Sequence, residues 1–394
     1  MDLSAKNKAI SPSPTLSIDA KFKAMKAAGE DVVGFGTGEP DFDTPQYIKD
    51  AAIKAISDGF TKYTPASGTL ELRNAIAEKL KKDNGLEYEA KNIVVSNGAK
   101  HSLVNAFSAI LNPGDEVIIP APFWVSYPEM VKMADGTPKY LYTKEENGFK
   151  FSASELENAI NDKTKALVLN SPSNPTGMVY NKKELEEIAD VCVRHNIFVI
   201  SDEVYEKLIY EGKHISIASF NDKIKDLTIT INGVSKSYAM TGWRIGYAAA
   251  NDEVAKIMSN IQSHAASNPN SIAQAATVAA LKGPQDEVEE MRKVFKERRD
   301  YMVERINSIE GVSCIKPSGA FYVMMNIEKL IGKTIAGVEI TGSDAFAEAF
   351  LAKQKVALVP GKGFGDDKYL RWSYATSMDN IKEGLSRLEK FLNE

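Results

Sequence analysis

Short apolar runs without a helical period recur along the first two thirds of the chain. Runs of this kind, rich in β-branched residues and ended by turn-forming residues, are typical of strands. They predict strands at residues 92–96, 116–120, 165–170, 197–201, 227–231 and 247–250. Helices are predicted at 18–28, 47–57, 70–82, 102–111, 183–195, 253–262, 271–281 and 286–309. The alternation of strands and helices indicates an α/β fold.

Three polar residues follow three of the predicted strands at a regular interval. Asn170, Asp202 and Lys236 are about 30 to 35 residues apart, each at or just past a strand end. Strand–helix–strand units of this length build parallel sheets, and ligands bind at the carboxyl ends of the strands. The spacing therefore predicts that these three side chains lie at one edge of a parallel sheet.

Lys236 lies in a turn of small residues, between Ser235 and Ser237, and Arg244 follows eight residues later. A lysine can serve as an amine nucleophile when desolvation or a second cation lowers its pKa. Arginine keeps its charge and suits a permanent anion such as phosphate. Together they suggest pyridoxal phosphate (PLP), which forms a Schiff base with lysine and carries one phosphate. Taken alone, a solvated lysine and a surface arginine explain the same residues equally well.

Other polar and aromatic residues follow strand ends in turns. The glycine-rich turn around Gly38 is not a dinucleotide-binding motif, because Pro40 follows and no helix begins there. The turn from Asn97 to Lys100 precedes a helix, whose free N–H groups suit phosphate, although it lacks the ending of a Walker motif. Singly, each such residue is as well explained by a connecting turn, a capping carboxylate or a buried aromatic ring.

The segments Gly233-Val-Ser-Lys236 and Met240-Thr-Gly-Trp-Arg244-Ile-Gly246 resemble the lysine signature of class I aminotransferases, which are fold-type I PLP enzymes. The turn from Ser171 to Gly177 and the segment from Asp202 to Tyr205 resemble further family motifs. The resemblance extends over nearly the whole chain and is strongest to the prokaryotic branch of aspartate aminotransferases. It implies a large domain with a mainly parallel seven-stranded sheet and a smaller α+β domain.

The resemblance also assigns roles to individual residues. It implies that Lys236 carries the cofactor and moves protons, that Asp202 binds the ring nitrogen, and that Tyr205 donates to the 3-oxygen. The full set of implied cofactor-binding residues is Tyr63, Gly98, Ala99, Lys100, Trp124, Asn174, Asp202, Tyr205, Ser235, Lys236 and Arg244. The implied substrate-binding residues are Ser13, Thr15, Gly38, Lys100, Trp124, Asn174 and Arg371. Because Tyr63 would reach the cofactor phosphate of a neighbouring subunit, a homodimer is expected.

The implied reaction is ping-pong transamination through pyridoxamine phosphate, with the substrate α-carboxylate on Arg371. Residues 258–284 contain no arginine for a second carboxylate, whereas Lys100 stands where the prokaryotic branch has a lysine for it. This favours L-aspartate and 2-oxoglutarate as substrates. Alternatives are transamination of prephenate, of aromatic or of neutral amino acids, or a PLP-dependent lyase reaction. One departure is Gly233, which stands where other branches have a phosphate-binding serine.

Length and composition complete the picture. A chain of 394 residues suggests two domains. We expect a large PLP-binding domain over 45–285 and a small domain from 1–44 together with 286–394. A net charge of −5 gives no reason to expect nucleic acid or an anionic membrane as partner. We expect a cytoplasmic protein, since the chain shows no signal peptide or apolar span and has two cysteines. The four histidines lack metal-ligand spacing, so no metal is expected.

The first residues are expected to differ from the rest. Pro12 and Pro14 disfavour helix and predict an extended arm over residues 1–18.

Overall fold

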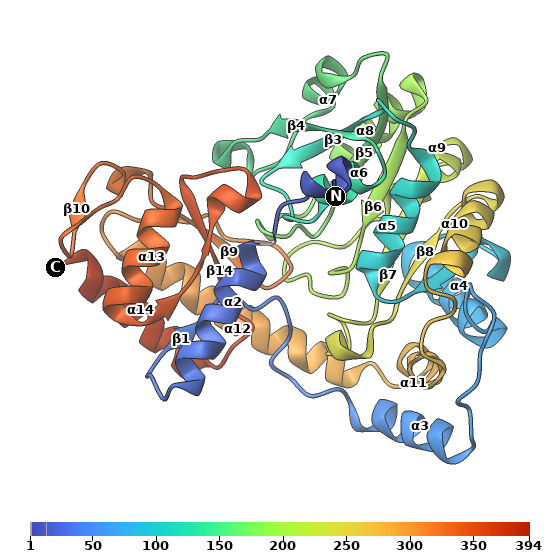
Figure 1. Cartoon of the computed structure of the whole chain (residues 1–394), viewed down its shortest axis with the longest axis horizontal. Helices are drawn as coiled ribbons and strands as arrows, with labels where there is room; N and C mark the ends of the chain where they lie inside the picture. Colours follow the sequence, from blue (N-terminus) through green and yellow to red (C-terminus); the bar gives the residue numbers. More distant parts are fainter. Residues whose placement is uncertain (1, 13) are drawn as a thin grey trace.

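A computed structural model describes residues 2–12 and 14–394. Its largest element is a seven-stranded sheet in the order β2-β8-β7-β6-β5-β3-β4 (Figure 1). The strands are β2 (Ile93–Ser96), β3 (Glu116–Ala121), β4 (Thr137–Tyr142), β5 (Thr164–Asn170), β6 (Phe198–Asp202), β7 (Thr228–Gly233) and β8 (Gly246–Ala249). Only β8 runs antiparallel to its neighbours. The expected mainly parallel seven-stranded sheet is confirmed.

Both faces of this sheet are apolar, as parallel sheets require when helices cover them on either side. On one face, β-strand residues such as Ile119, Val168 and Ile200 pack in a core with α5 (Ala99–Ile110), α6 (Tyr127–Met133) and α10 (Asp252–Ala265). The residues next to them in sequence, such as Leu167 and Val199, face the other side. The strict alternation of the strands thus produces a three-layer α/β/α unit.

The second face is covered by more helices. Those packed on it or next to it are α3 (Gln46–Ser57), α4 (Leu70–Asn84), α7 (Ala153–Ala159), α8 (Lys182–His195), α9 (Asp222–Leu227) and α11 (Ser271–Lys282). Local signals set their ends. Asn181 and Glu184 form a reciprocal capping box at the start of α8, and Gly85 ends α4 in the left-handed conformation.

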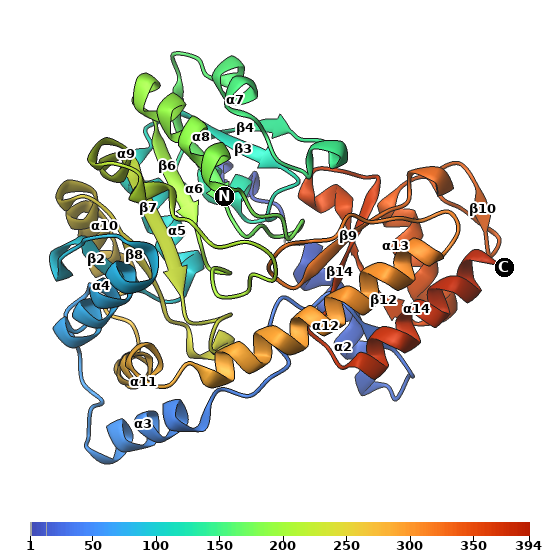
Figure 2. The ribbon, with the colours of Figure 1, turned by 180° about the vertical axis from the view of Figure 1, so that it is seen from behind.

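A second core forms beside the large sheet, mostly from the last third of the chain (Figure 2). Its elements are β9 (Tyr322–Asn326), β13 (Val359–Pro360) and β14 (Tyr369–Ser373) in one antiparallel sheet, with α12 (Asp286–Ser308), α13 (Ser343–Gln354) and α14 (Met378–Leu392). Short pairs add β1 (Val33–Gly34) to β12 (Val356–Ala357) and β10 (Thr334–Ile335) to β11 (Val338–Glu339). The parallel pairing of β1 with β12 joins the two ends of the chain in this unit. The domain boundaries given above stay a prediction.

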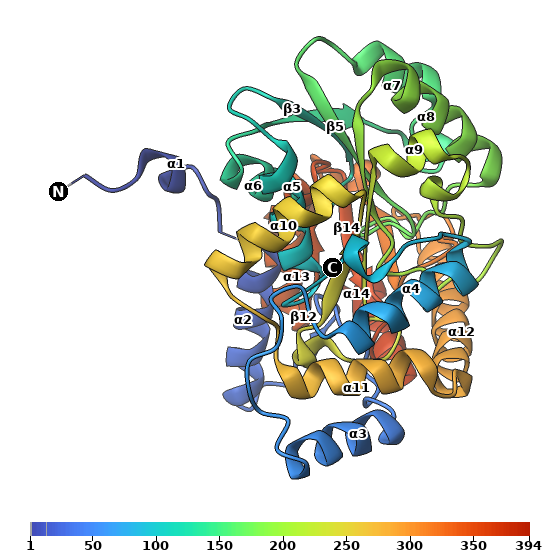
Figure 3. The ribbon, with the colours of Figure 1, turned by 90° about the vertical axis from the view of Figure 1, so that its right-hand side faces the viewer.

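The N-terminal arm departs from expectation. Residues 5–8 form α1 (Ala5–Lys8), and α2 (Pro14–Ala27) begins at a proline. Proline is tolerated in the first helical turn, because the N–H group it lacks would have no partner there. The expected extended arm over 1–18 is therefore wrong in part. Lys6 forms an ion pair with Asp135 at 2.8 Å, and α1 contacts α6. Figure 3 shows the N-terminal segment with α1 projecting from the rest of the molecule.

Among the described residues, no helix is long and apolar enough to cross a membrane.

Candidate active site

The ends of β5, β6 and β7 bring the three regularly spaced residues together. Asn170 is the register partner of Asp202, and Asp202 is the partner of Ile231, five residues before Lys236. Asn170, Asp202 and Lys236 line a cavity of about 430 Å³. Of the residues singled out from the sequence, the cavity is lined by Gly38, Ala99, Lys100, Trp124, Asn174, Asp202, Tyr205, Ser235, Lys236, Arg244 and Arg371.

Lys236 lies in the turn after β7, and its Nζ donates a hydrogen bond to the carbonyl oxygen of Gly38. Desolvation inside the cavity lowers the pKa of Lys236 to about 8; Glu39 opposes this shift, and Arg371 reinforces it. An amine with such a pKa is available as a base or nucleophile near neutral pH.

Asp202 ends β6 in a buried position. Its Oδ2 accepts a hydrogen bond from the Tyr127 hydroxyl at 2.7 Å, and its Oδ1 accepts one from the Val204 N–H at 3.3 Å. Burial raises the pKa of Asp202 to about 6, although these two hydrogen bonds oppose the shift. A buried carboxylate of this kind gains from a cationic N–H partner, as a protonated pyridine ring would supply.

Tyr205 shares a hydrogen bond of 2.9 Å with the Tyr322 hydroxyl. Burial raises the pKa of Tyr205 well above its usual value, which keeps the hydroxyl protonated and able to donate. Tyr322, on β9, links this side of the large sheet to the second core, so the cavity has walls from both units.

Arg371, on β14, is buried with its guanidinium aimed at the cavity. It donates to Asn174 Oδ1 at 2.9 Å and to the carbonyl oxygen of Gly36 at 2.8 Å, and its Cζ lies 4.3 Å from the centre of the Tyr322 ring. Its Nε has no hydrogen-bond partner among the residues that the structure describes. Since a buried donor without a partner costs free energy, this fork is ready for an anionic ligand.

A second anion-binding corner forms where α5 begins. Gly98 caps α5 with φ of 84°, and a Cβ at this position would clash with the Arg244 guanidinium. Arg244 itself donates to the carbonyl oxygens of Thr241 at 2.9 Å and Asn97 at 3.4 Å. The helix N-terminus and the guanidinium thus lie side by side, an arrangement that suits phosphate.

Gly233, the departure from other branches, lies at the end of β7 opposite Gly246. A Cβ there would lie 3.0 Å from the carbonyl oxygen of Ile245, so the backbone of β8 leaves little room for a side chain.

Lys100 and Trp124 lie together at the cavity wall. The Lys100 Nζ is 5.0 Å from the centre of the Trp124 ring. Partial desolvation lowers the pKa of Lys100, and Arg244 acts in the same direction. Trp124 and Lys100 thus place an aromatic ring and an ammonium group next to each other in the cavity that also holds Lys236.

Gly98 caps α5 next to Arg244 without itself lining the cavity. Three further sequence-derived residues lie away from the cavity or cannot be placed in it. Tyr63 is 91% exposed and makes no hydrogen bond or ring contact with the rest of the described chain. Ser13 lies outside the described residues, and the side chain of Thr15 also lies outside them.

Several cavity residues were not anticipated from the sequence. Tyr127 and Tyr322 hold Asp202 and Tyr205, and Thr241 donates to Glu39 at 2.8 Å. Lys23 of α2 also lines the cavity. From the sequence alone, the aromatic rings of Tyr127 and Tyr322 are equally well explained as core residues.

Comparison with known proteins decides what the cavity belongs to. The family model for aminotransferase class I and II matches residues 30–388. The chain belongs to this family. An aspartate aminotransferase of Bacillus subtilis is 50% identical, over all of both chains. A probable aspartate/prephenate aminotransferase of Aquifex aeolicus is 48% identical, covering 98% of this chain and 97% of the relative. The solved aspartate aminotransferase of Thermus thermophilus with maleate is 42% identical, with a TM-score of 0.94 and full coverage of both chains.

As a member of this family the protein is a PLP-dependent aminotransferase, which acts on amino acids and keto acids. The residues of the cavity fit the cofactor. Lys236 offers an amine with a lowered pKa, Asp202 a buried carboxylate for the ring nitrogen, and the glycine at 98 leaves the α5 N-terminus open to a phosphate beside Arg244.

Proposed function

We propose that this aminotransferase transfers the amino group of L-aspartate to 2-oxoglutarate, in two half-reactions. The observation that carries the proposal is that one cavity holds Lys236 together with several further cationic side chains, among them Arg371 and Lys100. A dicarboxylic amino acid needs one cation for each carboxylate. The names of the relatives, and the maleate of the Thermus thermophilus structure, support the same substrate class.

Arg371 is proposed to bind the α-carboxylate. The carbonyl oxygen of Gly36 and Asn174 Oδ1 hold its planar guanidinium in one orientation. The guanidinium can therefore bind both oxygens of the α-carboxylate without first changing its rotamer. Lys100 is proposed to bind the distal carboxylate, because its ammonium lies in the same cavity and is desolvated there.

Lys236 is proposed to move the proton of the reaction. The bound cofactor supplies an electron sink that acidifies the substrate Cα–H bond. The Lys236 amine would take that proton and return it to the C4′ atom of the cofactor, as general base and then general acid. Asp202 would keep the ring nitrogen protonated, and Tyr205 would donate a hydrogen bond to the 3-oxygen.

Steady-state rates with a panel of amino donors test the substrate. L-Aspartate is expected to give the highest kcat/KM, with oxaloacetate as product, ahead of L-alanine and L-phenylalanine. Replacement of Lys100 in K100M should raise the KM for L-aspartate about 10- to 100-fold and change that for L-alanine little. Lys82, on the surface of α4, supplies the control K82M. Preference for a neutral or aromatic donor, with no selective effect of K100M, would contradict the proposal.

Prephenate is a second candidate acceptor, favoured by the name of the Aquifex aeolicus relative. Prephenate also carries two carboxylates, so the same pair of cations can bind it. Measurable transfer from L-aspartate to prephenate, lost in K100M, would support it; an absence of transfer would exclude it.

A homodimer is proposed as the active unit. Tyr63 and the apolar side chains of Ile53, Ile56, Phe60 and Leu70 are exposed on and after α3 and at the start of α4. A second copy that covers this surface would bury them and would receive Tyr63 at its own cofactor phosphate.

Ser13 and Thr15 are proposed to close over the substrate. A cytoplasmic location is proposed from the composition.

A further inference from the structure

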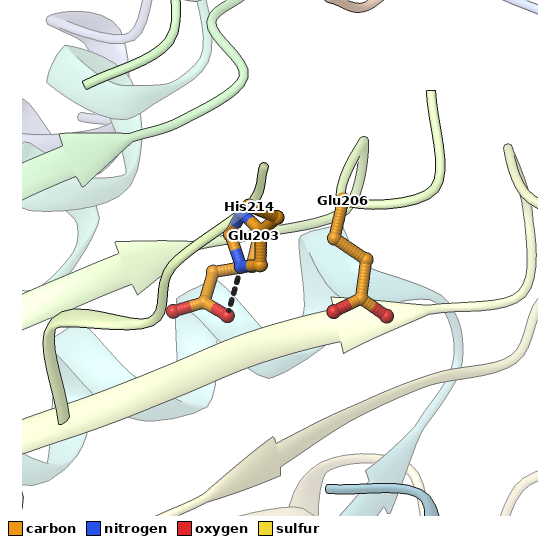
Figure 4. Close-up of side chains that lie close together, drawn as sticks. All are labelled: Glu203, Glu206 and His214. Atoms are coloured by element: carbon orange, nitrogen blue, oxygen red, sulfur yellow. Dashed lines mark hydrogen bonds and ion pairs between the residues drawn. The ribbon is translucent and has the colours of Figure 1, made fainter. Parts of the chain in front are cut away.

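Behind the catalytic residues lies a buried polar network that the reaction does not use. Glu203 and Glu206 belong to the same turn as Asp202 and Tyr205, but Asp202 and Tyr205 line the cavity whereas the two glutamates do not. The glutamates are buried on the far side of the turn, at 1% and 8% exposure. Figure 4 shows both of them beside His214.

The carboxylate of Glu203 is saturated with donors. Its Oε1 accepts from Ser201 at 2.8 Å and from Ser216 at 2.7 Å. Its Oε2 is 2.8 Å from His214 Nε2 and 3.4 Å from Asn84 Nδ2. Burial would lower the pKa of His214, but Glu203 and Glu206 raise it above its usual value, which favours the donor form. These hydrogen bonds hold the buried Glu203 carboxylate in a single orientation.

Glu206 is held from α4. Lys79 makes an ion pair with it, and Asn84 Nδ2 donates to it at 2.7 Å. The Oδ1 of Asn84 accepts a hydrogen bond from Lys79 Nζ, also at 2.7 Å. Burial would raise the pKa of Glu206, but Lys79 and His214 together lower it to about 2, so Glu206 stays ionised.

The cluster does not carry a metal site. The ligand atoms of Glu203, Glu206 and His214 lie within 4.8 Å of one another, which is close enough for a shared ion. However, the Lys79 ammonium already contacts Glu206, and serine, asparagine and histidine donors occupy Glu203. A metal ion would have to displace a resident cation and break these hydrogen bonds.

The turn itself is short and well bonded. Its backbone joins Glu203 N–H to the Ile231 carbonyl at 2.9 Å, and Glu206 N–H to the Glu203 carbonyl at 2.9 Å. A shift of either glutamate therefore moves the residues next to it. Glu203 also acts on Asp202 through its charge: burial is the main cause of the raised pKa of Asp202, and Glu203 adds to it.

We propose that Lys79, Asn84, Glu203, Glu206 and His214 form a positioning network that fixes the turn 202–206 from behind, so that Asp202 and Tyr205 face the cofactor. The five side chains are positioning residues, since none of them lines the cavity. The network ties α4 and the segment around Ser216 to the end of β6. The inference rests on the proposed roles of Asp202 and Tyr205.

The variant E203Q tests this network, with E157Q as matched control. Glu157 makes the corresponding pair on the surface, with Arg194 and, at 3.2 Å, His195. E203Q is expected to lower kcat about 10- to 100-fold, because a displacement of about 1 Å at the reacting groups costs that much. Its KM for L-aspartate should change little, since Arg371 and Lys100 are untouched. The PLP dissociation constant should rise, and the circular dichroism of the bound cofactor should weaken. E157Q should match the wild type in all four.

A purely structural network would give a different result. E203Q would then show a lower unfolding temperature but wild-type kcat, PLP affinity and cofactor dichroism in the folded protein, and the proposal would be overturned. If E203Q does not fold, H214Q serves, because it keeps the Glu203 carboxylate and its serine donors. A folded H214Q with wild-type kcat and dichroism overturns the proposal equally.

The two proposals fail in different ways. Wild-type protein that binds PLP but does not accept L-aspartate contradicts the proposed substrate only. The cofactor affinity and dichroism of E203Q still test the network in that case.

Discussion

At the scale of single residues, burial prepares Lys236 and Asp202 for the cofactor by opposing means. The same desolvation lowers the pKa of the lysine to about 8 and raises that of the carboxylate to about 6. Each shift disfavours the charged form and therefore costs stability in the protein without cofactor. A bound ring with a protonated nitrogen would give Asp202 a cationic partner in addition to its two hydrogen-bond donors.

Asp202 yields a pH-dependent prediction for the apoprotein. Because its folded pKa lies above the value of about 3.9 in unfolded chains, the folded state holds the extra proton, and stability falls as pH rises from about 4 to about 6. Above pH 6 the ionised group costs up to about 3 kcal/mol. D202N removes this cost. Urea unfolding should find apo D202N more stable than the wild type at pH 7, by about 1 to 3 kcal/mol, and equally stable near pH 4. A D202N apoprotein less stable than the wild type at pH 7 would contradict the account.

Arg371 yields a prediction about binding. R371L removes the fork and leaves a shorter apolar side chain on β14. The KM for L-aspartate should rise about 100-fold or more, since a charge-assisted bidentate pair is lost, while the PLP dissociation constant stays near that of the wild type. Arg305, in an exposed pair with Glu389, provides the control R305L. An equal loss of PLP affinity in R371L would place Arg371 at the cofactor instead.

At the scale of elements, strand ends and helix starts build the site. β5, β6 and β7 end at one edge and deliver Asn170, Asp202 and Lys236, while α5 begins beside Arg244. The positions of these three strand ends could be predicted from the sequence. Buried parallel strands appear as continuous apolar runs, and their regular spacing shows that their carboxyl ends lie at the same edge of the sheet.

Other elements could not be predicted so well. The edge strand β4 alternates only weakly between exposed and half-buried positions, so its apolar signal is faint. The start of α2 at Pro14 does not follow from the general disfavour of proline in helices, because proline destabilises helix interiors but not first turns. Tyr322 and the Glu203 network depend on contacts between segments far apart in the chain, which no local pattern encodes.

The start of α5 yields a prediction with a built-in control. Gly98 and Gly85 both have positive φ, but only a Cβ at Gly98 would meet another group, the Arg244 guanidinium. G98A and G85A should both lose about 1 to 2 kcal/mol of stability from backbone strain. Only G98A should also weaken PLP binding, by about tenfold or more, because Arg244 is displaced from the phosphate corner. Fluorescence titration of the apoproteins with PLP measures this; equal affinities would contradict the assignment.

At the scale of the whole molecule, the cavity lies between two cores and has walls from both. Arg371 and Tyr322 come from the second core, and Asp202 and Lys236 from the large sheet. Relative movement of the two units would therefore change the distance between the proposed carboxylate and cofactor sites. Such a site can close around its substrate and exclude water.

The proposed dimer predicts complementation between inactive chains. In a mixed dimer of Y63A and K236A chains, one of the two sites receives wild-type Tyr63 and wild-type Lys236, and the other receives neither. At limiting PLP, mixing the two variants after reversible dissociation should restore activity to about a quarter of the wild type, since half of the dimers are mixed and each has one intact site. Activity equal to the average of the two variants would argue that Tyr63 serves its own chain.

The spectrum of the bound cofactor tests the central claim most directly. The purified protein, loaded with PLP, is mixed with excess L-aspartate and then with 2-oxoglutarate, with K236A as control. The account predicts that L-aspartate shifts the visible absorption band and releases oxaloacetate, that 2-oxoglutarate restores the band, and that K236A releases no oxaloacetate. A band that L-aspartate leaves unaltered, but that a neutral or aromatic amino acid shifts, would contradict the substrate. Wild-type protein with no cofactor band at all would contradict the role of Lys236.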